Sequence, residues 1–306
     1  MLTATPSQLR RAVVALAIAS LAAQAAPARA GEGLFSRAYT TDTTPGGHWE
    51  LEQAVRNRTG RASGSYSAFD GITEAEYGVT DALQMALYFK TGYIDAHHAP
   101  DDDDPLGDTG AGGGFSRQKG FVQGVSAEFI YRILSPIKDP IGLAFYMEPE
   151  FDFTDLHNGL AYRGTFESEY RIIVQKNARD DRWVTAANLG IETEFIRFAG
   201  ESSWAGELDW NNELGSTYRF FPNWFFGLEA RNHNELGDFV HHEHSVYWAG
   251  PAAHYGGPHW WGTLGVLRQV YGDPSGTDAN GTFIGDHLFL RSHEKWEITS
   301  KVGFPF

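Results

Sequence analysis

The sequence predicts an all-β fold: a closed antiparallel transmembrane β-barrel of about 12 strands, with short periplasmic turns and longer external loops. Three observations predict it: an N-terminal export signal, long segments in which apolar and polar residues alternate, and connections that alternate between short and long. Only helices and closed barrels satisfy every backbone polar group in lipid. No segment after the first 30 residues approaches the ~20 apolar residues that a transmembrane helix needs, so strands must cross the membrane.

Residues 1–30 have the pattern of a cleaved signal peptide. Arg10 and Arg11 precede an apolar run over residues 12–26, and residues 28–30 (Ala-Arg-Ala) form a small-x-small cleavage pattern. The apolar run is too short for a membrane anchor. We therefore expect export by the general secretory route, cleavage after residue 30, and a location in the outer membrane of a Gram-negative cell.

After cleavage, the chain divides into a periplasmic N-terminal segment, residues 31–46, and an outer-membrane barrel, residues 47–306. The sequence leaves open whether residues 31–46 form a tail, an extra strand or a small plug. The net charge of the whole chain is −15, which excludes the basic surface that nucleic acid binding requires. The absence of cysteine excludes disulfides, thiolate metal sites and thiol catalysis.

Period-two alternation is clearest from Trp183 to Phe195, where one face is apolar and the other carries Asn188, Glu192 and Glu194. Twelve residue steps at ~3.3 Å, tilted ~40–45°, rise roughly 28–30 Å, which matches the apolar band of a bilayer with its interfaces. Strands of soluble sandwiches are usually only ~5–6 residues long. The length of the alternation therefore favours a membrane barrel.

Turn residues separate the alternating segments, and the longer polar connections fall at residues 96–117, 232–244 and 271–285. The segment at residues 244–255 contains Pro251 and alternates weakly, so ten or fourteen strands remain alternatives. An even number of strands puts both chain ends on the periplasmic side. The twelve predicted strands cover residues 47–59, 65–77, 82–95, 119–133, 141–153, 160–176, 182–197, 203–219, 223–232, 244–255, 259–271 and 288–306.

The last predicted strand alternates to its end and finishes on an aromatic residue. One face carries Trp296, Ile298, Val302, Phe304 and Phe306. This resembles the C-terminal signature by which the barrel-assembly machinery recognises outer-membrane proteins. The resemblance implies that Phe304 and Phe306 act as an assembly signal and that this machinery is a partner.

Short motifs along nearly the whole mature chain resemble an uncharacterised proteobacterial family of outer-membrane barrels. That family is a domain of unknown function, so the resemblance implies a fold and a location but neither an activity nor a site. The motifs are Trp49-Glu50-Leu51-Glu52-Gln53, residues 73–81, Leu134-Ser135-Pro136, Pro222-Asn223-Trp224-Phe225, Ala249-Gly250-Pro251 and Trp260-Trp261.

If the apolar faces contact lipid, the opposite faces line the lumen with an excess of carboxylates over basic residues. Small barrels pack such residues into Glu–Arg networks for stability, whereas unpaired carboxylates favour the passage of cations. Twelve strands fall between a filled barrel of eight and an open one of sixteen, so neither alternative is excluded. The predicted lumen residues are Glu52, Glu74, Glu76, Glu128, Glu148, Glu150, Glu167, Glu169, Arg171, Glu192, Glu194, Glu207, Asp209, Glu213 and Glu229.

His241, His242 and His244 form a compact cluster in a predicted external loop, with His233 nearby. Imidazoles at this spacing can ligate zinc or copper, and a solvated loop without fixed geometry is the alternative. No cofactor is expected. No G-x-S-x-G elbow or other compact nucleophile pattern is present, which leaves an outer-membrane hydrolase as the weakest alternative.

The sequence thus favours a passive channel or solute conduit with an acidic lumen that favours cations. The expected partners are outer-membrane lipid, the barrel-assembly machinery and small cationic solutes. The alternative is a closed structural or surface-interaction barrel that transports nothing.

Overall fold

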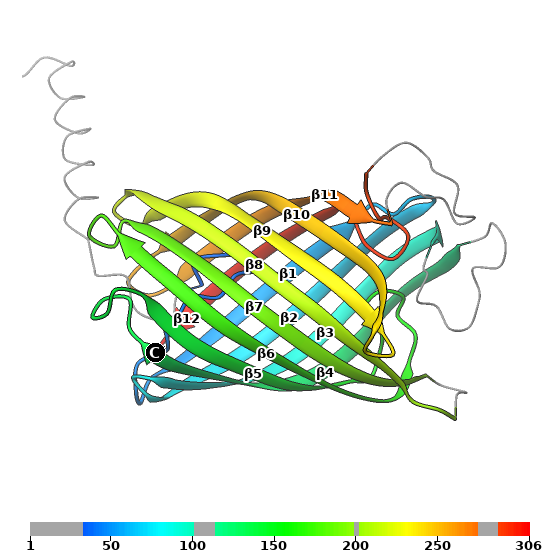
Figure 1. The fold of residues 1–306 in the computed structure, drawn as a ribbon, viewed down its shortest axis with the longest axis horizontal. Helices are drawn as coiled ribbons and strands as arrows, with labels where there is room; N and C mark the ends of the chain where they lie inside the picture. Colours follow the sequence, from blue (N-terminus) through cyan, green and yellow to red (C-terminus); the bar gives the residue numbers. More distant parts are fainter. Residues whose placement is uncertain (1–32, 101–113, 199–201, 275–286) are drawn as a thin grey trace, which may run out of the picture.

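The computed structural model describes residues 33–100, 114–198, 202–274 and 287–306, and these form a closed barrel of twelve antiparallel strands (Figure 1). The predicted fold class and strand number are confirmed. The predicted signal peptide lies outside the described residues. In the described part of the chain, no helix is long and apolar enough to cross a membrane.

Every strand pairs with its sequence neighbours, and β1 pairs with β12 to close the barrel. At this seam Phe306 exchanges two backbone hydrogen bonds with Trp49, of 2.9 and 3.1 Å. The strands are β1 (Trp49–Thr59), β2 (Ser65–Thr80), β3 (Leu83–Ala99), β4 (Phe115–Leu134), β5 (Gly142–Asp152), β6 (Tyr162–Ala178), β7 (Trp183–Phe198), β8 (Ala205–Phe221), β9 (Trp224–Gly237), β10 (His241–Gly256), β11 (Trp261–Asp273) and β12 (Trp296–Pro305).

The two ends of the barrel differ in their connections. At one end, here called the turn end, residues 81–82, 179–182 and 222–223 form tight turns, and the C-terminus lies there (Figure 1). At the other, the loop end, longer connections include residues 153–161 and the segment between β11 and β12. Short turns face the periplasm in outer-membrane barrels, which assigns the turn end to that side.

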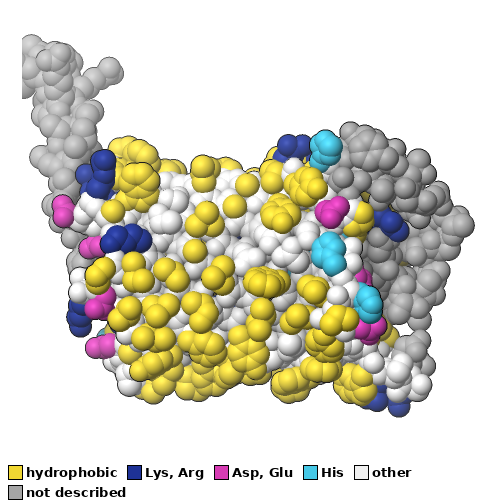
Figure 2. Space-filling view, viewed as in Figure 1, with side chains coloured by type: hydrophobic (Ala, Val, Ile, Leu, Met, Phe, Trp, Pro, Cys, Tyr) yellow, Lys and Arg dark blue, Asp and Glu magenta, His cyan; other side chains and the backbone are white. Residues whose placement is uncertain are grey.

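The outer surface is an apolar band with charged side chains gathered at its two ends (Figure 2). Leu87 and Leu228 are each 67% exposed, as side chains that contact lipid must be. Aromatic contacts at the turn end, such as Trp49–Tyr77 and Trp183–Tyr218, mark one rim of the band. Aromatic residues concentrate at membrane interfaces, so the band has the outline of a bilayer.

The prediction of an external loop over residues 232–244 is wrong. β9 continues to Gly237, β10 begins at His241, and a turn at residues 238–240 joins them. Beyond the lipid band both faces of a strand can be polar, so the alternation that reveals a strand disappears although the pairing continues. Pro251 lies in β10 between two stretches paired with β11, where its missing N–H is tolerated.

The predicted last strand over residues 288–306 begins only at Trp296. Residues preceding it fold into the barrel, where the side-chain Nε2 of Gln269 donates to the carbonyl oxygens of Phe289 and Glu294 at 2.9 and 3.2 Å. His293 and Glu294 are buried there. The β11–β12 connection therefore supplies part of the interior.

Residues 33–45, here called the inner segment, also lie inside the barrel and form no strand. Its backbone N–H groups donate to side chains of the barrel wall: Tyr39 to Asn188, Thr41 to Gln175, and Thr44 to Gln84, each at 2.7 Å. These bonds replace the strand partners that a buried backbone otherwise needs. Side-chain oxygens of the barrel wall thus hold the backbone of the inner segment in the lumen.

Candidate functional site

The barrel encloses a chamber of about 480 Å³. Ser36, Arg37 and Tyr39 of the inner segment bound it toward the turn end, and His157 and His293 from two inward-folded loops bound it toward the loop end. Among the residues that the structure describes, eighteen carboxylate side chains line the chamber, but only seven basic side chains of Lys and Arg do so. The charges are distributed unevenly around the wall.

One side of the chamber, formed by β5 to β8, carries two adjacent rows of acids that we call the acidic wall. Within each row the residues are direct cross-strand partners. Inward-facing positions recur every second residue, so the rows lie one above the other. The row nearer the loop end is Glu150, Glu167, Glu194 and Glu207, and the next is Glu148, Glu169, Glu192 and Asp209.

The carboxylates of the acidic wall crowd together with few counter-charges. One oxygen each of Glu167, Glu192 and Glu194 lies within 4.8 Å of the others. Lys90 binds both Glu148 and Glu150 at one end of the wall, and Arg171 binds Glu169. Among the described residues, Glu167, Glu192, Glu194 and Glu207 have no Lys or Arg nitrogen within 4.0 Å.

The opposite side, formed by β1, β2, β9 and β12, is here called the paired wall because three of its acids each meet a base, although Glu74 on β2 lies in a cluster with Glu52 and Glu76. Arg58 donates from Nε and Nη2 to the two oxygens of Asp70 at 2.9 and 3.0 Å. Arg231 lies 3.2 Å from Glu297. Lys301 lies 3.2 Å from Glu52 in the same way.

The predicted lumen residues fall into three groups. Twelve of them line the chamber: Glu52, Glu74, Glu148, Glu150, Glu167, Glu169, Arg171, Glu192, Glu194, Glu207, Asp209 and Glu213. Glu76 and Glu128 line a smaller cavity beside the inner segment. Glu229 holds the inner segment itself: its two oxygens accept from the N–H groups of Ser36, Arg37 and Ala38 at 2.9 to 3.3 Å and from the Ser36 hydroxyl at 2.6 Å.

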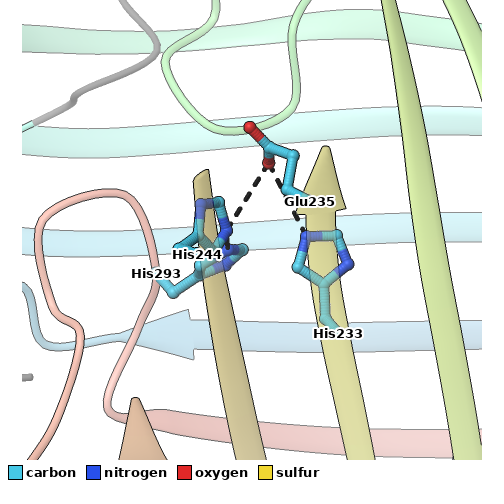
Figure 3. Close-up of side chains that lie close together, drawn as sticks. All are labelled: His233, Glu235, His244 and His293. Carbon is cyan, nitrogen blue, oxygen red and sulfur yellow. Dashed lines mark hydrogen bonds and ion pairs between the residues drawn. The ribbon is translucent and has the colours of Figure 1, made fainter. Parts of the chain in front are cut away.

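A second site lies at the loop end of the chamber, where His233, Glu235, His244 and His293 converge (Figure 3). One ligand atom from each lies within 4.8 Å of the others. Nε2 of His244 is 2.5 Å from Nε2 of His293 and 3.5 Å from Oε2 of Glu235. His233 Nε2 is 3.7 Å from the same carboxylate oxygen.

Three parts of the chain position these four side chains. His233 and Glu235 are two residues apart on β9 and therefore share its inward face. His244 on β10 is the cross-strand partner of Glu235, and His293 arrives from the β11–β12 connection. Glu235 and His293 were not predicted as ligands, because Glu235 lay in a predicted loop and His293 is 49 residues from His244. The H-x-E spacing of His233 and Glu235 would have been the usable signal.

Of the three predicted metal ligands, the structure brings only His244 into this cluster. His241 and His242 are exposed at the start of β10, and the His242 Nε2 lies 2.8 Å from the Ser245 hydroxyl.

The cluster is buried and backed by aromatic rings. His244 stacks on Phe289 with ring centroids 4.6 Å apart, and His293 meets Trp248 edge-on at 5.4 Å. Burial, with a smaller contribution from His244, lowers the pKa of His293 well below its ordinary value. The imidazole of His293 is therefore neutral at physiological pH, which is the form that can donate a lone pair.

Fold, apolar band and polar interior together define an integral outer-membrane β-barrel. The chain belongs to a family of unknown function, DUF6662, whose model matches residues 27–306. This confirms the resemblance to an uncharacterised outer-membrane family. None of the curated proteins matches the chain.

Solved structures that resemble the chain are outer-membrane barrels of low sequence identity. The COG4313 outer membrane channel from Pseudomonas putida F1 is 12% identical with a TM-score of 0.57, and the match covers 87% of this chain and 98% of that one. LpxR from Salmonella typhimurium is 7% identical with a TM-score of 0.46, over 83% and 99% of the two chains. The NalP translocator domain from Neisseria meningitidis is 11% identical with a TM-score of 0.46, over 97% of each. At these identities the likeness concerns the fold alone.

Proposed function

We propose that the barrel is a passive conduit whose lumen favours small cations or basic solutes. The acidic wall carries this proposal. Rings of carboxylates lower the barrier for positive charge and raise it for negative charge. In the part of the chain that the structure describes, Glu167, Glu192, Glu194 and Glu207 have no Lys or Arg nitrogen within 4.0 Å, so their carboxyl groups are open to a cationic solute.

The arrangement of acids in the acidic wall does not favour stability, and this supports a functional role. Like charges placed directly opposite one another on neighbouring strands are destabilising. Here six such cross-strand pairs join β5, β6, β7 and β8. Bound cations would relieve that repulsion, whereas a lumen built only for packing would pair these positions as the paired wall does.

Passage requires a path beside or past the inner segment. Its described contacts with the barrel are packing and hydrogen bonds in which at least one partner is a side chain, with no strand ladder. Glu229 is its strongest anchor, because hydrogen bonds to a charged group exceed neutral ones. The inner segment can therefore leave the lumen without breaking the barrel.

The similar fold named as an outer membrane channel in Pseudomonas putida agrees with this proposal. The proposal itself rests on the charges of this chain.

Planar-bilayer recording of the refolded mature protein tests the proposal, beside a variant that lacks residues 33–45. We expect discrete current steps, larger in the deletion variant, with a reversal potential in a salt gradient whose sign indicates cation preference. Anion preference in either protein would contradict the proposal.

The second candidate is a closed structural barrel, and the inner segment together with the inward-folded loops favours it. Silence of both proteins, when each shows the heat-modifiable mobility of a folded barrel, would establish this candidate instead.

We also propose that the C-terminal strand carries an assembly signal. Phe304 and Phe306 are exposed on the outer surface at the β1–β12 seam, 47% and 71% respectively. Phe306→Ser should lower the amount of folded barrel in the outer membrane of cells, while refolding of the purified chain in detergent should change little.

A further inference from the structure

We infer that His233, Glu235, His244 and His293 form a binding site for a divalent transition-metal ion such as Zn²⁺ at the loop end of the lumen. Three imidazole nitrogens and one carboxylate oxygen make a donor set that Zn²⁺ accepts in tetrahedral geometry. The inference does not require the barrel to conduct, so metal binding by a silent barrel would leave it intact.

The orientation of the donors supports a shared ligand. Nε2 atoms of His244 and His293 point at each other, and both His233 and His244 turn Nε2 toward the same oxygen of Glu235 (Figure 3). In a tetrahedral zinc site with bonds near 2.0–2.1 Å, ligand atoms lie roughly 3.3 Å apart. The distances of 2.5, 3.5 and 3.7 Å between donors differ from that spacing by less than about 1 Å, and the remaining donor pairs lie within 4.8 Å, so small side-chain rotations supply the adjustment.

A second observation concerns Asn211, which contacts the other ring nitrogen of His233. Asn211 donates from Nδ2 to the Glu192 carboxylate at 3.2 Å, which leaves its Oδ1 facing His233 Nδ1 at 2.9 Å. His233 Nδ1–H therefore donates to Asn211, and its Nε2 keeps a free lone pair directed into the cluster. Metal-ligating histidines are typically fixed in this way through their other ring nitrogen.

The site joins parts of the molecule that are otherwise separate. Two neighbouring strands supply His233, Glu235 and His244, and the β11–β12 connection supplies His293. A metal ion would therefore tie this connection to the barrel wall at the mouth of the chamber. The wall of buried Phe289 and Trp248 behind the imidazoles excludes water from the rear of the site.

The test is calorimetric titration of Zn²⁺ into the refolded mature barrel, prepared without a histidine tag. We expect one Zn²⁺ per barrel. His244→Gln and His293→Gln should each weaken binding by at least about tenfold, in line with the loss of a supporting or ligating group. The matched control is His241→Gln/His242→Gln, which removes the two exposed imidazoles beside the site and should leave the affinity unchanged.

Two further readouts keep the test decisive if one variant folds poorly. Co²⁺ bound to the wild-type barrel should give the visible absorption of a tetrahedral site, and the absorption should vanish in His293→Gln. Zn²⁺ should also raise the urea midpoint of the wild type but not of His293→Gln, because the ion stabilises only a barrel that binds it. Binding that survives in His244→Gln and His293→Gln but disappears in the exposed-histidine control would overturn the inference, as would the absence of Zn²⁺ binding by the wild type.

Discussion

The acidic wall and the paired wall face each other across one chamber, but their buried charged residues have different neighbours. On the paired wall, Arg58 meets Asp70 and Arg231 meets Glu297, so these four charges have partners. On the acidic wall, Glu167 faces Glu194 and Glu192 faces Asp209 on neighbouring strands. The same barrel therefore pairs buried acids with bases on one side and places acids directly opposite acids on the other.

The largest effect should come from breaking the paired wall. Arg58 is only 3% exposed and also donates to the Leu156 carbonyl oxygen at 2.8 Å. Arg58→Met leaves Asp70 as a buried charge without its main partner, which costs about 3–5 kcal/mol. The free energy of unfolding in urea, measured on the barrel in lipid vesicles, checks this value.

The double variant Arg58→Met/Asp70→Leu is the control for that prediction. Replacing both members of a buried pair is often nearly neutral, so it should recover most of the lost stability. A double variant as unstable as the single one would show that the pair is not what stabilises this wall.

A smaller, local effect should follow from releasing the inner segment. Glu229→Ala removes an acceptor of four hydrogen bonds that fix the inner segment and no strand of the barrel, so the loss is confined to this segment. We expect the folded barrel in detergent to become sensitive to trypsin at Arg37, followed by mass spectrometry. Glu229→Gln retains an acceptor oxygen and should be cleaved more slowly; equal protection of Glu229→Ala and wild type would show that other contacts hold the segment.

The smallest effect should be a gain in stability on the acidic wall. Glu192→Gln/Glu194→Gln removes cross-strand repulsion while keeping the acceptor that Asn211 uses. We expect the urea unfolding free energy to rise by about 0.5–1 kcal/mol, the scale of cross-strand pair energies. A loss of stability would mean that these carboxylates have stabilising partners, and the contrast between the two walls would fail.

The barrel could be predicted from sequence because lipid imposes alternation on every strand it touches. That is why Trp183 to Phe195 already showed both faces of β7. Where the strands rise above the lipid band the constraint ends, and His233 to His244 therefore looked like a loop although it continues β9 and β10. The charges of the lumen could be listed, since they occupy the opposite face of the same strands.

How those charges combine could not be predicted, because it depends on contacts between distant parts of the chain. The inner segment has no periodicity, and its partners lie as far as 230 residues away, as for Gly33 and Thr263. His293 reaches His244 only through the path of the β11–β12 connection. Glu229 was predicted only as a residue that lines the lumen, and its role as an anchor of the inner segment could not be seen in the sequence.

The most direct test of the central claim is the reversal potential of Glu192→Gln/Glu194→Gln in a salt gradient, compared with wild type. Asp180→Asn is the matched control, since it removes charge from an exposed turn and asparagine tolerates the positive φ of 54° there. The account predicts that the double variant loses much of the cation preference while the control keeps it. An unchanged reversal potential in the double variant would show that the acidic wall does not line the path of the permeating ion.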